Sequence, residues 1–304
     1  MLRKLRDLML EGGGRDYIAA ASGLVRHGDW LYVIADDEHF LGIFPASGDA
    51  PGKRLSLLDP RLPNDPAARK ASKPDLEVIT LLPEAVWPPH GALLALGSGS
   101  TPRRCGGIVM PFDAGGKPGA PRWFDLAPLY AGLSAILPEL NMEGAVHAGD
   151  ALLLFQRGNG PAGVNAIIEQ KWNKLRARIA GQGPEAAAQM EWSARRIQQV
   201  DLGAVRGIPL GFTDASVLPD GRVVFSAVAE DSASTYADGL CAGAAVGLLD
   251  AAGKVLSLQE VDPPYKVEGV HAEQSGSRVE LLLVADADDP SRPAPLLAGI
   301  LKID

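Results

Sequence analysis

A short motif that occurs five times along the chain most strongly limits how it can fold. In each copy an acidic or hydroxyl residue precedes a small or apolar residue at the start of a strand-like run. The copies are Ser22-Gly23-Leu24, Glu77-Val78-Ile79, Glu143-Gly144-Ala145, Asp214-Ala215-Ser216 and Glu268-Gly269-Val270. They lie roughly 55 to 70 residues apart, and a long repeat with several strands per unit is typical of a β-propeller, whereas solenoid units are usually shorter. The sequence therefore predicts an all-β, five-bladed propeller, with a six-bladed ring as the alternative.

Each copy of the motif is followed by two apolar runs with a polar turn between them. The pairs are Trp30–Ala35 with Phe40–Phe44, Leu93–Leu96 with Gly107–Met110, Leu152–Gln156 with Asn165–Ile168, Val223–Val228 with Ala244–Leu249, and Val279–Ala285 with Leu296–Ile300. Runs of this length, bounded by Gly, Asp, Ser and Pro, favour strands over helices. Each repeat is thus expected to contribute several strands of one blade.

A third landmark, Asp followed by Pro or Leu, comes late in each repeat and predicts how the ring closes. It occurs at Leu58-Asp59-Pro60, Phe124-Asp125-Leu126, Val200-Asp201-Leu202 and Val261-Asp262-Pro263, and the fifth copy is Arg6-Asp7-Leu8 near the N-terminus. The C-terminal repeat ends after its second apolar run, so its outer strand has to come from Leu2–Leu8. Closure by both ends of the chain would leave no open sheet edge between the last blade and the first.

The 304 residues are interpreted as a single propeller domain spanning 1–304. Rings of this kind often exceed the usual size of one domain. Residues 170–199 break the strand pattern and are expected to form an insertion in the third blade, as an extended hairpin or a short helix with a Gly-Pro turn at Gly183-Pro184. The insertion is expected to be either a lid or partner-binding arm, or an addition to the outer edge of the blade.

Composition limits the partners and the compartment. Hydrophobic residues make up 46% of the chain, and 37 Asp and Glu against 29 Lys and Arg give a net charge of -8. Such a chain lacks the concentrated basic surface that nucleic acid needs. No signal peptide and no membrane-spanning run is visible, so a soluble, cytoplasmic monomer with no membrane partner is expected. The two cysteines, Cys105 and Cys241, do not indicate a disulfide framework.

Innermost strands line the central channel of a propeller, so the five motif residues should meet around one axis. This would bring together Ser22 and four carboxyl groups, those of Glu77, Glu143, Asp214 and Glu268. Such carboxylates need a cation, basic neighbours or raised pKa values. Three roles stay open: a structural tie that accepts backbone N–H groups, a metal site for calcium or magnesium made of all four acids, or catalysis by Glu143 and Glu268.

Basic and hydroxyl residues are expected near the same carboxyl groups. Arg157 ends a predicted second strand and suits a carboxylate or phosphate ligand. Lys73 and Lys266 precede Glu77 and Glu268, and Ser98 lies in the turn Gly97–Thr101, which is followed by Arg103 and Arg104. We therefore expect Arg157, Lys266, Lys73 and Ser98 to bind a small anionic ligand. No nucleophile elbow, HExxH motif, dinucleotide fingerprint or Cys/His zinc pattern is present.

Two segments carry a family resemblance. Asn141-Met142-Glu143-Gly144-Ala145 and Lys266-Val267-Glu268-Gly269-Val270 resemble the Glu-Gly inner-strand motif of bacterial propellers described as phytase-like, or as esterase-like activity of phytase, and of the related SdiA-regulated group. The nearest relatives are expected to be uncharacterised. The resemblance implies an acidic channel associated with calcium and with hydrolysis of esters or phosphoesters. Glu143 and Glu268 match the motif, Glu77 and Asp214 are variants, and Ser22 departs from it.

Two functions follow from these patterns. The first is a metal-assisted hydrolase of small anionic esters or phosphoesters, in which Glu143 or Glu268 polarises water and Arg157 holds the negative group of the substrate. The alternative is a non-catalytic propeller scaffold that binds a ligand or a protein.

Overall fold

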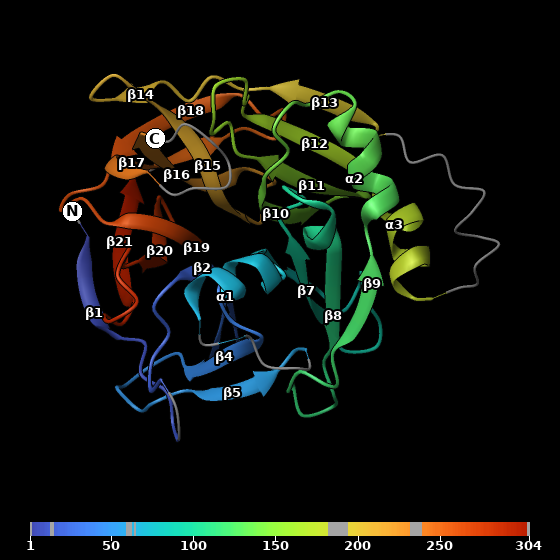
Figure 1. Cartoon of the computed structure of the whole chain (residues 1–304), viewed down its shortest axis with the longest axis vertical. Coiled ribbons are helices and arrows are strands. Elements are labelled where there is room, and N and C mark those ends of the chain that lie inside the picture. Colours follow the sequence, from blue (N-terminus) through green and yellow to red (C-terminus); the bar gives the residue numbers. More distant parts are fainter. Residues whose placement is uncertain are drawn as a thin grey trace.

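The computed structural model describes residues 2–12, 15–58, 63, 65–181, 194–231 and 239–302. The strands of these residues form five separate antiparallel sheets, and the sheets are arranged as a ring (Figure 1). This is the arrangement of a five-bladed β-propeller, so the predicted fold class is confirmed and the six-bladed alternative is not.

The blades follow one another along the chain. Blade 1 contains β2 (Ala21–His27), β3 (Trp30–Ala35), β4 (Phe40–Pro45) and β5 (Lys53–Ser56), and blade 2 contains β6 (Leu76–Leu82), β7 (Ala92–Gly97), β8 (Gly106–Pro111) and β9 (Arg122–Asp125). Blade 3 contains β10 (Met142–Ala148), β11 (Ala151–Gln156), β12 (Ala166–Lys171) and β13 (Arg196–Gln199). Blade 4 contains β14 (Ala204–Val205), β15 (Ile208–Val217), β16 (Val223–Asp231), β17 (Leu240–Leu249) and β18 (Val255–Glu260).

Blade 5 is completed by the N-terminal strand, as the sequence predicts. It contains β19 (Lys266–Ser275), β20 (Arg278–Asp286), β21 (Pro295–Lys302) and β1 (Arg3–Asp7). β1 pairs antiparallel with β21, with Asp7 opposite Pro295. Arg6 then joins blade 5 to blade 1, because its guanidinium donates hydrogen bonds to the backbone carbonyls of Pro45 and Gly48.

Every innermost strand carries a β-bulge, which lies near the start of β2, β6, β10 and β19 and in the middle of β15. The bulged residues are Ser22, Glu77, Glu143, Thr213 and Glu268. Four of them are the predicted motif residues, but in blade 4 the equivalent residue is Thr213 and not Asp214. The prediction for blade 4 is therefore wrong by one residue, because the acidic Asp214 directly follows the hydroxyl residue Thr213 that occupies the bulge. A bulge leaves one residue out of the ladder and re-aims its side chain.

Three α-helices lie among the described residues: α1 (Pro66–Ser72), α2 (Ala127–Ser134) and α3 (Trp172–Ile179). A 3₁₀ turn, η1, covers Pro102–Arg104. None of the described helices is long and apolar enough to cross a membrane. The predicted insertion at 170–199 contains α3 and the outer strand β13, while its Gly183-Pro184 turn lies outside the described residues.

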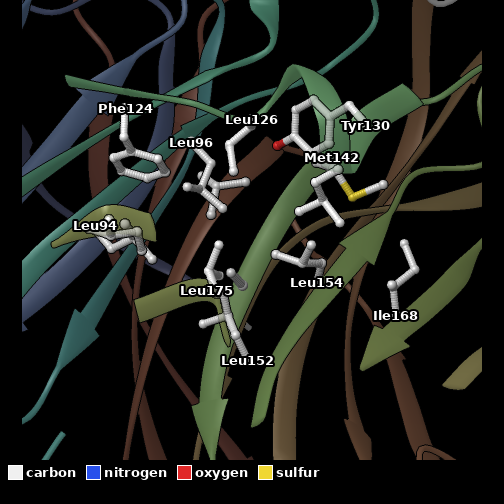
Figure 2. Packing of buried hydrophobic residues seen from close by; sticks show 14 of the residues in the cluster. Leu94, Leu96, Phe124, Leu126, Tyr130, Met142, Leu152, Leu154, Ile168 and Leu175 are labelled. Carbon is white, nitrogen blue, oxygen red and sulfur yellow. The ribbon is translucent and has the colours of Figure 1, made fainter. Parts of the chain in front are cut away.

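The largest apolar contact described lies between blades 2 and 3. Leucines of the middle strands, such as Leu94 and Leu154, pack with Tyr130 of α2 and Leu175 of α3 (Figure 2). Strand residues at alternate positions point into this contact, which is the two-residue period of the sequence runs. Each fully buried leucine stabilises the fold by about 1.5–3 kcal/mol relative to an exposed one. These contacts hold neighbouring blades, and hence the ends of their innermost strands, in fixed positions.

Candidate functional site at the channel mouth

Three bulge carboxyl groups, those of Glu77, Glu143 and Glu268, lie near the starts of β6, β10 and β19. Arg157, which directly follows β11, joins two of them: its Nη1 lies 3.4 Å from Glu143 Oε1 and 3.8 Å from Glu268 Oε2. Its Nη2 donates a 2.8 Å hydrogen bond to Glu230 Oε2 of β16. One guanidinium therefore ties three carboxylates that come from blades 3, 4 and 5.

Lys266 makes a second junction on the same side. Its Nζ lies 3.4 Å from Glu230 Oε1 and 3.6 Å from Glu268 Oε1. It also lies 2.8 Å from Asp288 Oδ1 and 3.4 Å from Asp286 Oδ2 at the end of β20. Glu230 and Glu268 are thus shared between Lys266 and Arg157, which makes one continuous network.

Lys73 and Arg104 form a corresponding network between blades 1 and 2. Lys73, the residue after α1, pairs with Asp36 and, at 2.9 Å, with Asp75 Oδ1. Arg104 Nη1 lies 2.8 Å from the other oxygen of Asp75, which also accepts a hydrogen bond from the Ser98 hydroxyl. The side chains of Ser98 and Arg104 are therefore already bound to Asp75 and do not form an open anion nest.

We refer to these residues together as the channel mouth, and among them carboxyl groups outnumber cations by eight to four. The carboxyl groups are Asp36, Asp75, Glu77, Glu143, Glu230, Glu268, Asp286 and Asp288, and the cations are Lys73, Arg104, Arg157 and Lys266. Glu77 has no ion pair or hydrogen bond to its carboxylate in the part of the chain that the structure describes. Such a surplus has to be met by bound protons or by another cation.

Burial raises the pKa values of the three bulge glutamates, Glu77, Glu143 and Glu268. It raises the pKa of Glu143 to about 7 against the opposing effect of Arg157. It raises the pKa of Glu268 to about 8 although Arg157 and Lys266 both act to lower it. The pKa of Glu77 lies well above its ordinary value because burial, and then the negative charge of Glu143, disfavour the ionised form. Several of these groups therefore hold protons near neutral pH.

The pKa values of the cations Arg157 and Lys266 are also raised, but by neighbouring charges and not by burial. Burial alone would lower the pKa of Arg157, but Glu143, Glu268 and Glu230 outweigh it and raise the pKa. The same balance raises the pKa of Lys266, where Glu268 and Asp286 are the main partners. Both side chains therefore stay charged while their carboxyl partners titrate.

Asp214 lies apart from this network and joins the innermost strands. Its carboxylate is fully buried and accepts hydrogen bonds from the backbone N–H groups of Val270, at 2.8 Å, and Ala215, at 2.7 Å. The Leu24 N–H group of blade 1 also bonds to it. Burial raises the pKa of Asp214, while these N–H groups act to lower it. These contacts match the predicted structural role, in which a carboxylate accepts hydrogen bonds from backbone N–H groups of neighbouring strands. Asp214 is therefore not grouped with the other three predicted metal ligands.

Three carboxyl groups lie close enough to share a metal ion. One oxygen each from Asp36, Asp75 and Glu77 falls within 4.8 Å of the others. Oxygen ligands alone suit a hard cation such as calcium or magnesium. Because the Lys73 ammonium pairs with Asp36 and Asp75, a metal ion would have to displace it. Glu143 and Glu268 are instead grouped around Arg157.

Asp75 and Asn141 belong to the mouth, although the sequence patterns did not predict them as site residues. Asn141 Nδ2 donates a 2.6 Å hydrogen bond to Glu143 Oε1. A polar or charged residue lies two residues before each bulge glutamate: Asp75, Asn141 and Lys266. This spacing is the sequence pattern that could have identified Asp75 and Asn141 as site residues. In blade 4 the place is taken by Gly211, where a Cβ would lie 2.8 Å from Arg157 Cγ. That glycine leaves room for the Arg157 side chain.

The sequence profile of one protein family matches residues 17–301. The chain belongs to the family of unknown function DUF6929. No curated protein matches it. Three similar solved structures are a protein of unknown function from Dyadobacter fermentans, the glutaminyl cyclase of Myxococcus xanthus and a luciferin-regenerating enzyme.

The Dyadobacter protein is 11% identical with a TM-score of 0.48, and the alignment covers 100% of this chain and 99% of that one. The glutaminyl cyclase is 12% identical with a TM-score of 0.47, covering 100% and 97%. The luciferin-regenerating enzyme is 10% identical with a TM-score of 0.43, covering 95% and 80%.

Proposed function

We propose that this protein hydrolyses small anionic esters or phosphoesters at the channel mouth, with Glu143 and Glu268 as the acid–base pair. The observation that carries the proposal is that two carboxyl groups with pKa values of about 7 and about 8 flank one guanidinium. Acids and bases are most effective when their pKa values lie near the working pH. The Glu-Gly motifs at both residues, which resemble those of phytase-like propellers, support the same reading.

With pKa values of about 7 and about 8, the two carboxyl groups together hold a shared proton near neutral pH, so one member can act as a base and the other as an acid. We assign the base to Glu143, which takes a proton from the attacking water as the water oxygen bonds to the carbonyl carbon or phosphorus. We assign the acid to Glu268, which donates its proton to the leaving oxygen as that bond breaks. While Glu268 is protonated it carries no negative charge, so the positive charge of Arg157 is less completely balanced. The guanidinium can then bind the negative group of the substrate.

A divalent cation is part of the proposal, because the mouth carries surplus negative charge that would repel an anionic substrate. Asp36, Asp75 and Glu77 are the residues that would hold it, since their oxygens lie within 4.8 Å of one another. When bound, the ion would offset this charge and polarise the substrate oxygen. Lys73 would then release its two carboxylate partners.

The experiment is a hydrolase panel with p-nitrophenyl phosphate and carboxylate-bearing nitrophenyl esters, measured with calcium, with magnesium and with chelator. We expect Glu143→Gln to lower kcat about 100-fold or more. Glu84→Gln, which changes an exposed glutamate in the turn after β6, is the matched control and should leave kcat unchanged. Turnover that persists in a folded Glu143→Gln protein would overturn the acid–base assignment.

The second candidate is a non-catalytic scaffold that binds a ligand or protein partner. It is favoured by the observation that Arg157, Lys266 and Lys73 are all engaged in ion pairs within the protein. This candidate predicts no turnover on any substrate of the panel. It also predicts that Glu143→Gln lowers the thermal stability, and that chelator leaves the stability of the wild-type protein unchanged.

A further inference from the structure

Three side-chain nitrogens in blade 3 and the helix that follows it are buried without a hydrogen-bond partner. They are His147 Nε2, Gln170 Nε2 and Trp172 Nε1, and none finds an acceptor or donor in the part of the chain that is described. Gln170 and Trp172 are only 4% and 7% exposed. Neither the acid–base pair nor the proposed cation uses these residues.

The strand register brings two of these side chains, those of His147 and Gln170, to one face of the blade. His147 of β10 is opposite Leu152 of β11, and Leu152 is opposite Gln170 of β12. Residues directly opposite each other on antiparallel strands point to the same face. Leu152 belongs to the packed contact between blades 2 and 3, as Figure 2 shows, so this face is turned toward blade 2.

Trp172, the first residue of α3, packs beside His147 on the same face. Its ring lies 5.3 Å from that of His147, nearly perpendicular to it at 87°, and 6.4 Å from that of Trp87 on blade 2. The nitrogens thus lie beside aromatic rings and leucine side chains. They are also far along β10 from Glu143, because Glu143 is near the start of that strand and His147 is near its end.

Buried polar groups in folded proteins are almost always paired, either with protein atoms or with bound water. Gln170 Nε2 and Trp172 Nε1 can only donate, so their partner must be an acceptor. Burial lowers the pKa of His147, so its ring is neutral at pH 7 and one ring nitrogen can accept a hydrogen bond. A charged partner is unsuited, because none of these three side chains would balance its charge.

We propose that His147, Gln170 and Trp172 form a buried site between blades 2 and 3 for a small hydroxyl ligand, either water or an alcohol. The ligand oxygen accepts hydrogen bonds from Gln170 Nε2 and Trp172 Nε1, and its hydrogen is donated to His147 Nε2. His147 is then held in the tautomer that carries its proton on Nδ1.

Nuclear magnetic resonance on the wild-type protein tests the site directly. We expect a magnetisation-transfer peak between the Trp172 indole proton and bound hydroxyl protons, and nitrogen shifts that report the Nδ1–H tautomer of His147. A missing peak together with the Nε2–H tautomer would overturn the proposal.

The Gln170→Met variant distinguishes an occupied site from a dry one, because the two cases predict opposite changes in Tm. If the ligand is present, the variant removes one of its donors and we expect Tm to fall by about 2 to 4 °C. If the site is dry, the variant removes an unsatisfied amide from an apolar contact and Tm rises. Gln274→Met, an exposed position on β19, is the control and should shift Tm by less than about 1 °C.

The two sources of the hydroxyl group are separated by mass spectrometry of a solvent extract of the denatured protein. A stoichiometric alcohol identifies an organic ligand, and an extract without one, combined with the expected resonance peak, identifies water. Either result supports the site.

Discussion

At the scale of single residues, the acids of the channel divide into two kinds according to what surrounds them. Glu143 and Glu268 face side-chain cations and hold pKa values near neutrality, whereas Asp214 faces backbone N–H groups from three innermost strands. An innermost strand exposes unpaired N–H groups along the channel, and one carboxylate satisfies several of them here. The Asp214 side chain therefore joins innermost strands of different blades by hydrogen bonds.

Replacing Asp214 tests this tie. Asp214→Ala leaves buried N–H groups of Val270, Ala215 and Leu24 without their acceptor, so we expect the free energy of unfolding to fall by at least about 2 kcal/mol in urea titrations. Asp214→Asn keeps one acceptor oxygen and should lose less. The exposed Asp16→Ala is the control, and a loss below about 0.5 kcal/mol in Asp214→Ala would contradict the tie.

At the scale of elements, the decisive feature is that blade 5 is built from both ends of the chain. β1 covers the edge of β21, which would otherwise remain open for pairing with another chain. Arg6 strengthens the closure because it reaches past its own blade to carbonyl groups of blade 1. The ring is therefore closed by strand pairing and by a side-chain link.

We expect Arg6→Ala to lower the free energy of unfolding by about 1–3 kcal/mol, since hydrogen bonds from a charged donor are lost at the closing blade. Arg3→Ala removes an exposed arginine from the same strand and should change stability by less than about 0.5 kcal/mol. Thermal denaturation of both variants measures the difference. Equal stability of the two variants would show that Arg6 does not contribute to closure.

At the scale of the whole molecule, the free energy of unfolding depends on pH through the carboxyl groups of the channel mouth. Carboxyl pKa values of about 7 and about 8 in the folded protein lie above their ordinary value of 4.5, so the folded state binds more protons than the unfolded state between about pH 5 and pH 8. Stability is then greatest at the acid end of this window and falls as the pH rises through the folded-state values. The slope approaches about 1.4 kcal/mol per pH unit for each carboxyl that titrates.

The free energy of unfolding, measured at intervals from pH 5 to pH 8, should fall in the wild-type protein and fall less steeply in Glu143→Gln. The two glutamates share Arg157, so their titration belongs to the pair and both contributions should change in the variant. Glu84→Gln should keep the wild-type slope. A slope that is the same in all three proteins would place the titrating groups elsewhere.

Most of the architecture was predictable because it depends on periodic local patterns. Alternating apolar runs between glycine and aspartate turns specify strands, and the return of the motif at Ser22, Glu77, Glu143, Asp214 and Glu268 specifies five units. The missing last strand and the Arg6-Asp7-Leu8 landmark were sufficient to predict that β1 completes blade 5. The exception is blade 4, where a one-residue choice between Thr213 and Asp214 depends on the bulge, which no local pattern marks.

The amino-acid sequence by itself determined the fold class, the number of blades, the closing strand and which residue types meet near the axis. Only the tertiary structure decided their partners: that Arg157 serves three carboxylates, that Lys73 pairs with the otherwise unnoticed Asp75, and that Asp214 binds backbone instead of a cation. The physical reason is that strand formation depends on nearby residues, whereas charge balance and burial depend on side chains from different blades, tens of residues apart in the chain.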